Sequence, residues 1–330
     1  MPDQHSETVL RTHTMLKTAM GSVINLALDD PSVVEIMLNP DGAIWLDYHG
    51  RGRMDTGQTM SVSEAERVVR LVGSHIGQEV TCKRPVVSAE LPGGGERFEG
   101  VIPPVTAAPC FAIRKPAARV FSLEDYVVDG TLTLLQADAL RKAIIARRNI
   151  LIVGGTGSGK TTLANALLSE IAETGDRVVI LEDTRELQCA APDKVSLRTQ
   201  AGLVSMADLV RSTLRLRPDR IIVGEVRGPE ALDMLKAWNT GHPGGIATVH
   251  ANSARGGLTR LEQLVSAASA QTPYPLIAEA INVIVFITGR GDARRIQTIC
   301  EVTRHDGADY LLAPLGAPSD NVVSLKGETT

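Results

Sequence analysis

The stretch that decides the fold is Gly154-Gly155-Thr156-Gly157-Ser158-Gly159-Lys160-Thr161, which fits the pattern G-x-x-x-x-G-K-[ST] without a mismatch. It follows the apolar run 150–153 and opens a helical pattern over 160–172, which is the strand–loop–helix context that the motif requires. Glycines let the backbone wrap around phosphate oxygens, and the N-terminus of the helix adds a partial positive charge. The sequence therefore predicts a phosphate-binding loop between a strand and a helix.

The polar side chains of this loop have distinct expected roles. Lys160 can bridge the β- and γ-phosphates of a nucleotide, and the Thr161 hydroxyl can ligate Mg²⁺. The loop alone does not separate ATP from GTP. We expect the whole loop and the residue after it to bind the nucleotide: Gly154, Gly155, Thr156, Gly157, Ser158, Gly159, Lys160, Thr161 and Thr162.

Three further strand patterns end in residues that could complete a hydrolytic site. The acidic segment 182–186 follows one, Glu225 follows the second in the form of a Walker B strand, and His250 follows the third. Ligands bind at the carboxyl edge of a parallel sheet, where an attacking water needs a base and Mg²⁺ needs a second anchor. Taken singly, such residues are typical of helix caps or satisfied core histidines. Together, on a sheet that carries a phosphate loop, they predict a nucleotide-hydrolysing site.

Composition and charge exclude several other classes. The 330 residues leave room for two ordinary domains, with 34 basic against 38 acidic residues and a net charge of −4. With only two Trp, four Tyr and four Phe, the chain gives no strong signal for direct nucleic-acid binding. The four cysteines form no C-x-x-C pair, which argues against a zinc ribbon. The longest apolar run, 281–287, is far shorter than the ~20 residues of a membrane helix, so any membrane association is expected to be peripheral.

The first 115 residues mix helical and strand patterns and predict a small α+β domain. Between two strands, Asn39-Pro40-Asp41-Gly42 is a hairpin signal, because Asp-Gly accepts positive φ. Residues 116–130 contain Pro116, Gly130 and few apolar runs, and are predicted to be a linker or hinge. The patterns predict helices over 15–28 and 64–75, and strands over 33–38, 44–46, 86–90, 97–102 and 111–114.

Residues 131–315 show strand–helix alternation. Repeated units of this kind build a parallel sheet covered by helices on both faces. Ser205, with Asp208 three residues on, has the pattern of a helix N-cap. The tail 316–330 is polar and rich in small residues, and is expected to be disordered. We predict helices over 134–147, 160–172, 206–217, 229–239 and from 253, and strands over 149–153, 177–181, 220–224, 245–249 and 283–288.

Four segments stand in the order of the Walker A, Asp box, Walker B and His box of the secretion-superfamily traffic ATPases. They are 154–161, 181–187, 217–227 and 240–252. The sequence most resembles the conjugal-transfer ATPases of type IV secretion systems, over about residues 20–312. The resemblance extends into the first domain at 83–85, 90–92, Arg97, 103–104 and 113–116.

This resemblance implies a fold and a set of roles. The fold is α/β: a RecA-like P-loop ATPase domain with a mixed parallel sheet, preceded by a smaller α+β N-terminal domain. ATP and Mg²⁺ are the implied cofactors. Glu186 would position or deprotonate water, Glu225 would hold the metal–water shell, and His250 would report the state of the γ-phosphate. Arg97 and Arg114 would reach the nucleotide from the N-terminal domain, like arginine fingers.

The resemblance also implies partners and a location. Such proteins form hexameric rings on the cytoplasmic face of the inner membrane. There they bind inner-membrane subunits of the secretion or conjugation apparatus, and they power its assembly, its pilus or the passage of substrate.

Three alternatives stay open. A type II secretion or type IV pilus motor belongs to the same superfamily. Many secretion motors carry a four-cysteine zinc insert that this chain lacks. In the pilus motors the Asp box resembles E-D-P, whereas this chain has Glu182-Asp183-Thr184. A DNA helicase or translocase fits the acidic balance poorly. A scaffold that binds nucleotide without hydrolysis would not need the acids and His250.

Overall fold

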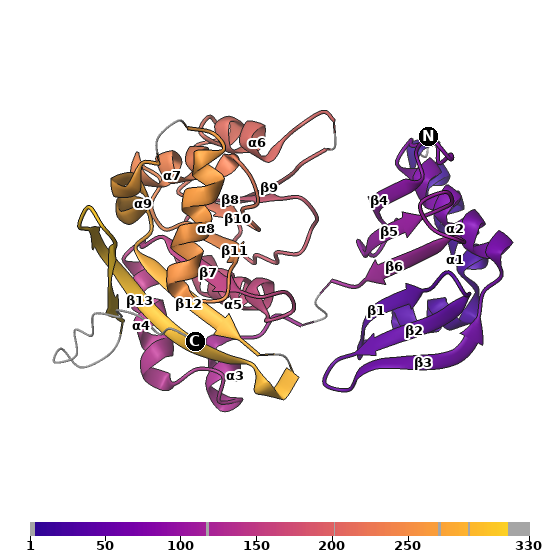
Figure 1. The fold of residues 1–330 in the computed structure, drawn as a ribbon, viewed down its shortest axis with the longest axis horizontal. Coiled ribbons are helices and arrows are strands. Elements are labelled where there is room, and N and C mark those ends of the chain that lie inside the picture. Colours follow the sequence, from indigo (N-terminus) through magenta and orange to yellow (C-terminus); the bar gives the residue numbers. More distant parts are fainter. Residues whose placement is uncertain (1–3, 117–118, 201, 270–271, 290, 316–330) are drawn as a thin grey trace. The chain divides into compact units, whose positions relative to one another are not determined.

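Two compact units make up the chain, which a computed structural model describes over residues 4–116, 119–200, 202–269, 272–289 and 291–315 (Figure 1). Unit 1 is Met1–Ala118 and unit 2 is Arg119–Thr330. The expected disordered tail, 316–330, lies outside the described residues. No helix in the described part of the chain is long and apolar enough to cross a membrane.

The expected linker over 116–130 contains both a unit boundary and a short helix. The boundary between the units falls inside it, but helix α3 (Leu123–Val128) forms in its second half. Ser122 caps this helix in a capping box with Asp125, and Leu123 and Tyr126 are buried in a hydrophobic core of unit 2. A six-residue helix is too short to show a helical repeat, which is why the sequence pattern missed it.

Unit 1 is an antiparallel sheet with the strand order β3-β2-β1-β6-β5-β4 and two long helices. Helix α1 begins earlier than expected and is interrupted at Gly21, where φ is 73°. The missed strand, β3, is almost wholly exposed, so it lacks the alternation of a half-buried strand. The elements are α1 (Gln4–Asp29), β1 (Val33–Leu38), β2 (Ala43–Tyr48), β3 (Gly52–Thr59), α2 (Val62–His75), β4 (Val86–Glu90), β5 (Arg97–Val101) and β6 (Cys110–Arg114).

Unit 2 is built on an eight-stranded sheet with the order β14-β13-β12-β7-β11-β10-β8-β9. The six strands from β12 to β9 are parallel, and β13 and β14 extend the sheet in the antiparallel sense. The predicted mixed parallel sheet is therefore confirmed. The strands are β7 (Ile150–Gly154), β8 (Val178–Glu182), β9 (Lys194–Arg198), β10 (Arg220–Val223), β11 (Ile246–His250), β12 (Val283–Thr288), β13 (Arg295–His305) and β14 (Tyr310–Pro314).

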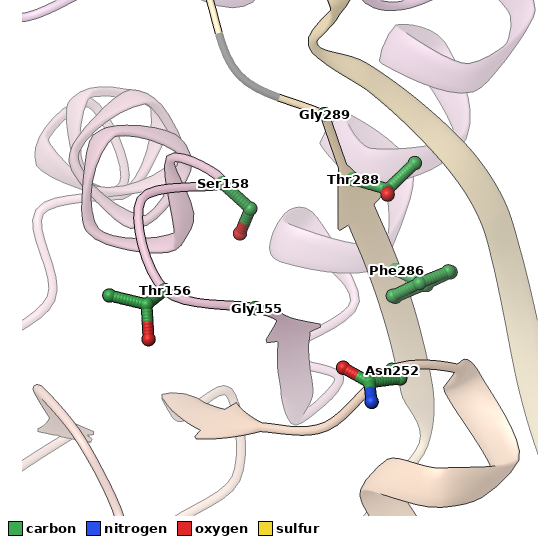
Figure 2. Close-up of a pocket in the computed structure, with 7 residues that line it drawn as sticks. All are labelled: Gly155, Thr156, Ser158, Asn252, Phe286, Thr288 and Gly289. Carbon is green, nitrogen blue, oxygen red and sulfur yellow. The ribbon is translucent and has the colours of Figure 1, made fainter.

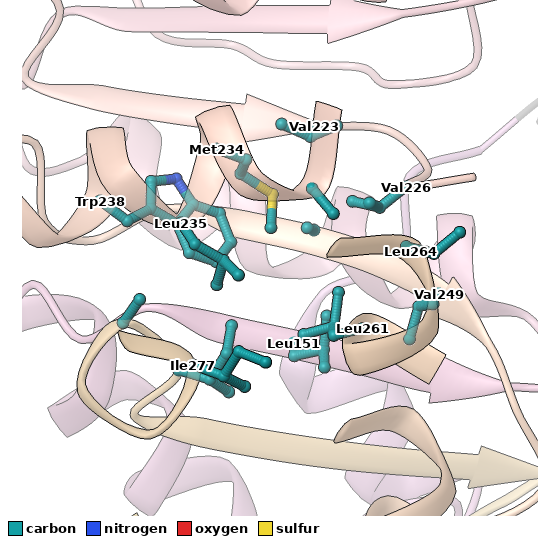
Figure 3. Close-up of a cluster of buried hydrophobic side chains, with 14 of the residues drawn as sticks. Leu151, Val223, Val226, Met234, Leu235, Trp238, Val249, Leu261, Leu264 and Ile277 are labelled. Atoms are coloured by element: carbon teal, nitrogen blue, oxygen red, sulfur yellow. The ribbon is translucent and has the colours of Figure 1, made fainter. Parts of the chain in front are cut away.

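Helices cover both faces of this sheet, and each face has its own core. Leu151 and Val153 of β7 point into a cluster with the helices α6 to α9 (Figure 3), whereas Ile150 and Ile152 pack with α3, α4 and α5. Strands buried on both faces read as continuous runs of Val, Ile and Leu. The remaining helices are α4 (Leu134–Ile145), α5 (Lys160–Ala172), α6 (Met206–Thr213), α7 (Glu230–Asn239), α8 (Ala254–Ser266) and α9 (Tyr274–Ala280), with the short 3₁₀ helix η1 (Gly291–Ala293).

Asn149 fixes the starting points of the three central strands. Its Oδ1 accepts hydrogen bonds from the backbone N–H groups of Gly244 (2.7 Å) and Gly245 (2.9 Å), ahead of β11. Its Nδ2 donates to the carbonyl of Ala280 (2.7 Å), ahead of β12. The side chain is only 3% exposed. One amide therefore sets the register of β7 with both of its neighbours.

Replacing Asn149 by alanine should destabilise unit 2 strongly. Asn149→Ala leaves two backbone N–H groups and one carbonyl without their partner, and each buried group left unsatisfied costs about 1–3 kcal/mol. We expect a loss of about 3 kcal/mol in the free energy of unfolding, measured by urea denaturation. The control Asn239→Ala removes a single exposed hydrogen bond to Glu279 and should cost under about 0.5 kcal/mol. Equal losses in the two variants would contradict this role.

Candidate active site

The loop over 154–161 joins the buried strand β7 to helix α5. Gly157 and Gly159 have φ values of 75° and 95°, in the left-handed region that favours glycine, and Gly159 is the N-cap of α5. Lys160 is 7% exposed, and its ammonium donates to the carbonyl of Gly155 (2.9 Å). The backbone thus curls around a lysine that its own carbonyl holds in place.

Four of the other predicted site residues gather around this lysine. The Nζ atom of Lys160 lies 3.2 Å from Nε2 of His250, the last residue of β11, and the same Nε2 lies 3.1 Å from Oε1 of Glu225. On another side, Thr161 donates from Oγ1 to Oε2 of Glu186 (3.2 Å). The sheet order brings these groups together, because β11 lies beside β7, β10 beside β11, and β8 beside β10.

His250 lies between a cation and an anion. Burial lowers its pKa, the charge of Lys160 lowers it further, and Glu225 opposes the shift. The imidazole is therefore neutral at pH 7. A neutral Nε2 can accept a hydrogen bond from Lys160, or carry the proton and donate to Glu225, so its tautomer selects one of these two partners.

The remaining predicted residues, Arg97 and Arg114, belong to unit 1. They stand directly opposite each other on the neighbouring strands β5 and β6. Their pairing places the two arginines at the same end of these interior strands, and their contact with a nucleotide stays a prediction.

Sequence reasoning left Glu182 without a role, and the structure gives it one. Its carboxylate is 3% exposed, and Oε1 accepts the backbone N–H groups of Glu186 (2.8 Å) and Leu187 (2.7 Å). Burial raises the pKa of Glu182 to about 7, against the opposing effect of these two hydrogen bonds. Its place at the last position of a fully buried strand was the signal that could have separated it from the exposed acids beside it.

Two other residues support the acidic segment and were also missed. Asn165 of α5 donates from Nδ2 to the carbonyl of Glu186 (3.2 Å) and accepts from the backbone N–H of Gln188 (2.8 Å). Arg227 pairs with Glu225 and lies 3.5 Å from Asp183. The helix after the phosphate loop thus holds Glu186 in place, and a guanidinium ties together the acids that follow β8 and β10.

A cavity of about 300 Å³ adjoins the phosphate loop (Figure 2). One wall is the loop itself, and the others are Asn252, after β11, and the end of β12. The Oγ atom of Ser158 is buried and has no hydrogen-bond partner among the described residues. The lining residues are Gly155, Thr156, Ser158, Asn252, Phe286, Thr288 and Gly289.

The donor set fits a nucleotide with Mg²⁺. Within the described residues, no cluster of three or more His, Cys, Asp or Glu could hold a metal unaided. Mg²⁺ characteristically binds through one or two protein oxygens and completes its shell with phosphate and water. The Thr161 hydroxyl, with Glu186 and Glu225 nearby, offers this kind of partial set.

Comparison with known proteins finds a matching family, similar sequences and similar solved structures. Residues 21–319 match the family described as "Type II/IV secretion system protein". A protein of Sinorhizobium fredii named "Probable conjugal transfer protein TrbB" is 50% identical over 307 residues, covering 91% of this chain and 94% of that protein. The type IV secretion system protein PtlH of Bordetella pertussis is 34% identical over 311 residues, covering 82% of this chain and 91% of that protein. The pilus retraction motor PilT, solved with bound ADP, shares the fold at 19% identity and a TM-score of 0.60, covering 88% of this chain and 80% of PilT.

Glu182 should make the stability of the protein depend on pH. Below its ordinary pKa of 4.5 the carboxyl is protonated in both folded and unfolded chains. Between 4.5 and about 7 it ionises only when unfolded, so stability falls as the pH rises. Glu182→Gln keeps a carbonyl acceptor and removes this dependence. Between pH 5 and pH 8 we expect wild type to lose about 3 kcal/mol more than the variant, measured by urea denaturation.

Glu173→Gln is the matched control for this measurement. Glu173 is an exposed residue at the end of α5, so its replacement should leave the pH profile of wild type unchanged. Parallel profiles for wild type and Glu182→Gln would show that the buried carboxyl does not titrate in this range.

Proposed function

The chain belongs to the type II/IV secretion system protein family, and we propose that it is a Mg²⁺-dependent ATPase that powers a type IV secretion or conjugative transfer apparatus, or the assembly of its pilus. One observation carries the hydrolytic part of this proposal. A buried lysine, two carboxylates and a neutral histidine meet at the phosphate loop, at the carboxyl edge of a parallel sheet. The relatives named for conjugal transfer and type IV secretion support the process that hydrolysis drives.

Each side chain has one task in this proposal. Lys160 binds the β- and γ-phosphates, while Thr161 and Glu225 hold the metal. Mg²⁺, when bound, neutralises charge on the phosphate oxygens. Glu186 orients the attacking water and accepts its proton, a role for which Asn165 holds its backbone in place.

His250 would report whether a γ-phosphate is present. Without nucleotide, Lys160 is shared between the carbonyl of Gly155 and Nε2 of His250. A phosphate that attracts Lys160 frees this nitrogen, and the tautomer that donates from Nε2 to Glu225 is then favoured. Glu225 in turn pairs with Arg227, which lies 3.5 Å from Asp183, so a change at His250 can alter these ion pairs.

The N-terminal unit supplies further positive charge at the γ-phosphate. Arg97 and Arg114 approach the γ-phosphate as arginine fingers, which typically contribute ~10³–10⁵ in rate. The hinge lies within the predicted linker 116–130, ahead of α3. Six copies form a ring on the cytoplasmic face of the inner membrane, where it works on secretion or conjugation subunits.

Two substitutions in the loop region should separate binding from hydrolysis. Lys160→Ala removes the cation from the phosphate loop, so it should weaken Mg·ATP binding and abolish turnover. Glu186→Gln removes only the carboxylate that orients water, so it should keep Mg·ATP affinity within about threefold and lower kcat by at least about 100-fold. Calorimetric titration and phosphate release measure the two quantities.

The exposed acid Glu173 gives the control, because Glu173→Gln should leave both quantities at wild-type values. A Lys160→Ala protein that hydrolyses ATP at the wild-type rate would remove the basis for the proposed activity. Normal turnover in Glu186→Gln would show that another acid orients the water.

The arginines of unit 1 should affect rate more than affinity. Arg97→Ala and Arg114→Ala remove charges that act on the γ-phosphate in the transition state, so kcat should fall by ~10³ while ADP affinity changes by less than about threefold. Arg53→Ala, on the exposed strand β3 of the same unit, should change neither. If the finger variants and the control behave alike, the N-terminal unit does not take part in hydrolysis.

A further inference from the structure

We propose that Arg294 binds the polyphosphate of the nucleotide in the loop 154–161, on the part that ADP and ATP share. Arg294 follows η1 and directly precedes β13, outside all four motif segments. The inference rests on the proposed nucleotide-dependent function and adds a binding residue from the C-terminal end of the same unit.

The guanidinium of Arg294 lies against the last glycine of the loop. A Cβ built on Gly159 would lie 2.8 Å from Nε and 3.0 Å from Cζ of Arg294, closer than ordinary packing allows. Gly159 is the N-cap of α5, and the next residue is Lys160. The arginine head group is therefore next to the point where the backbone amides of the loop and the helix N-terminus meet.

One donor of this guanidinium lacks an acceptor. Among the described residues, the buried Nε atom of Arg294 has no hydrogen-bond partner. The helix N-terminus and Lys160 are both positive, so they repel the guanidinium. Buried donors without partners are rare, and a phosphate chain would supply the missing acceptors and negative charge. These conditions favour a polyphosphate over a neutral ligand.

The backbone holds Arg294 in this place before any ligand arrives. Its N–H donates to the carbonyl of Gly291 (3.1 Å), and its own carbonyl lies 3.5 Å from Oγ1 of Thr131. Thr131 also accepts the N–H of Ile296 (2.9 Å). Gly289 ends the strand beside the loop (Figure 2), and a Cβ there would lie 2.0 Å from the carbonyl oxygen of Ala293. Ala293, which directly precedes Arg294, therefore lies against the residue that follows β12.

The position of Arg294 indicates which part of the nucleotide it contacts. In the proposed function, Glu186, Glu225 and His250 act at the γ-phosphate end of the site. The arginine lies instead at Gly159, at the start of the helix. We therefore assign it to ground-state binding of ADP and ATP alike, in contrast to an arginine that acts only on the γ-phosphate.

The test compares Arg294→Ala and Arg294→Gln with the control Arg295→Ala in the full-length protein. Arg295 is the exposed neighbour, and its replacement removes the same charge. Calorimetric titrations use Mg·ADP, a non-hydrolysable Mg·ATP analogue and pyrophosphate. Loss of a charged hydrogen bond to phosphate predicts a 10- to 100-fold weaker affinity for all three ligands in both Arg294 variants, and less than a twofold change in Arg295→Ala.

Several results would overturn the assignment. If Arg294→Gln bound like wild type while Arg294→Ala did not, the side chain would act through packing rather than charge. Weaker ADP binding with unchanged pyrophosphate binding would place the contact at the base or ribose. Wild-type affinities in both variants would reject Arg294 as a ligand and leave the proposed function intact, whereas a wild-type protein that binds none of the three ligands would contradict the proposed function itself.

Discussion

The buried ammonium of Lys160 is the constraint around which unit 2 is arranged. A charge removed from water is costly unless hydrogen bonds and opposite charges compensate it. Here the compensation comes from the carbonyl of Gly155, from Nε2 of His250 in the tautomer that accepts, and from the negative charge of Glu225 nearby. These partners are weaker than a phosphate group would be, because one is a carbonyl and another is a neutral ring. The site is therefore stable without ligand and ready to exchange these contacts for a polyanion.

The parallel sheet makes this arrangement possible. In the register of β11 with β7, His250 stands opposite Gly154, so the histidine lies beside the start of the phosphate loop. The same edge carries Glu225 after β10 and Glu182 at the end of β8. At the opposite, amino ends of the central strands, Asn149 makes three side-chain hydrogen bonds. These bonds fix the register of the strands and so the relative positions of their carboxyl ends. The chemistry at one edge thus depends on a buried amide at the other.

The sequence predicted those helices and strands that contain an apolar run or a motif. The strands β1, β4 and β12 and the helix α5 have the predicted bounds. The signal is strongest for β12, a continuous buried apolar run, and for α5, which the phosphate-loop motif opens. Exposed edge strands such as β3 and β9, and the short helix α3, have no such pattern. Arg294 could not have been assigned from sequence, because its surroundings come from a segment distant along the chain. For Glu182 the one sequence signal was its place at the end of an apolar strand.

The central claim is that these residues hydrolyse ATP with the help of Mg²⁺. The most direct measurement is the release of inorganic phosphate from ATP by the purified full-length chain, in Mg²⁺ and again after the metal is chelated. We expect steady release in Mg²⁺ and loss of release on chelation, because the Thr161 hydroxyl and the nearby carboxylates offer only a partial ligand shell, which phosphate oxygens and water complete. No release in Mg²⁺, or release that continues unchanged after chelation, would contradict it.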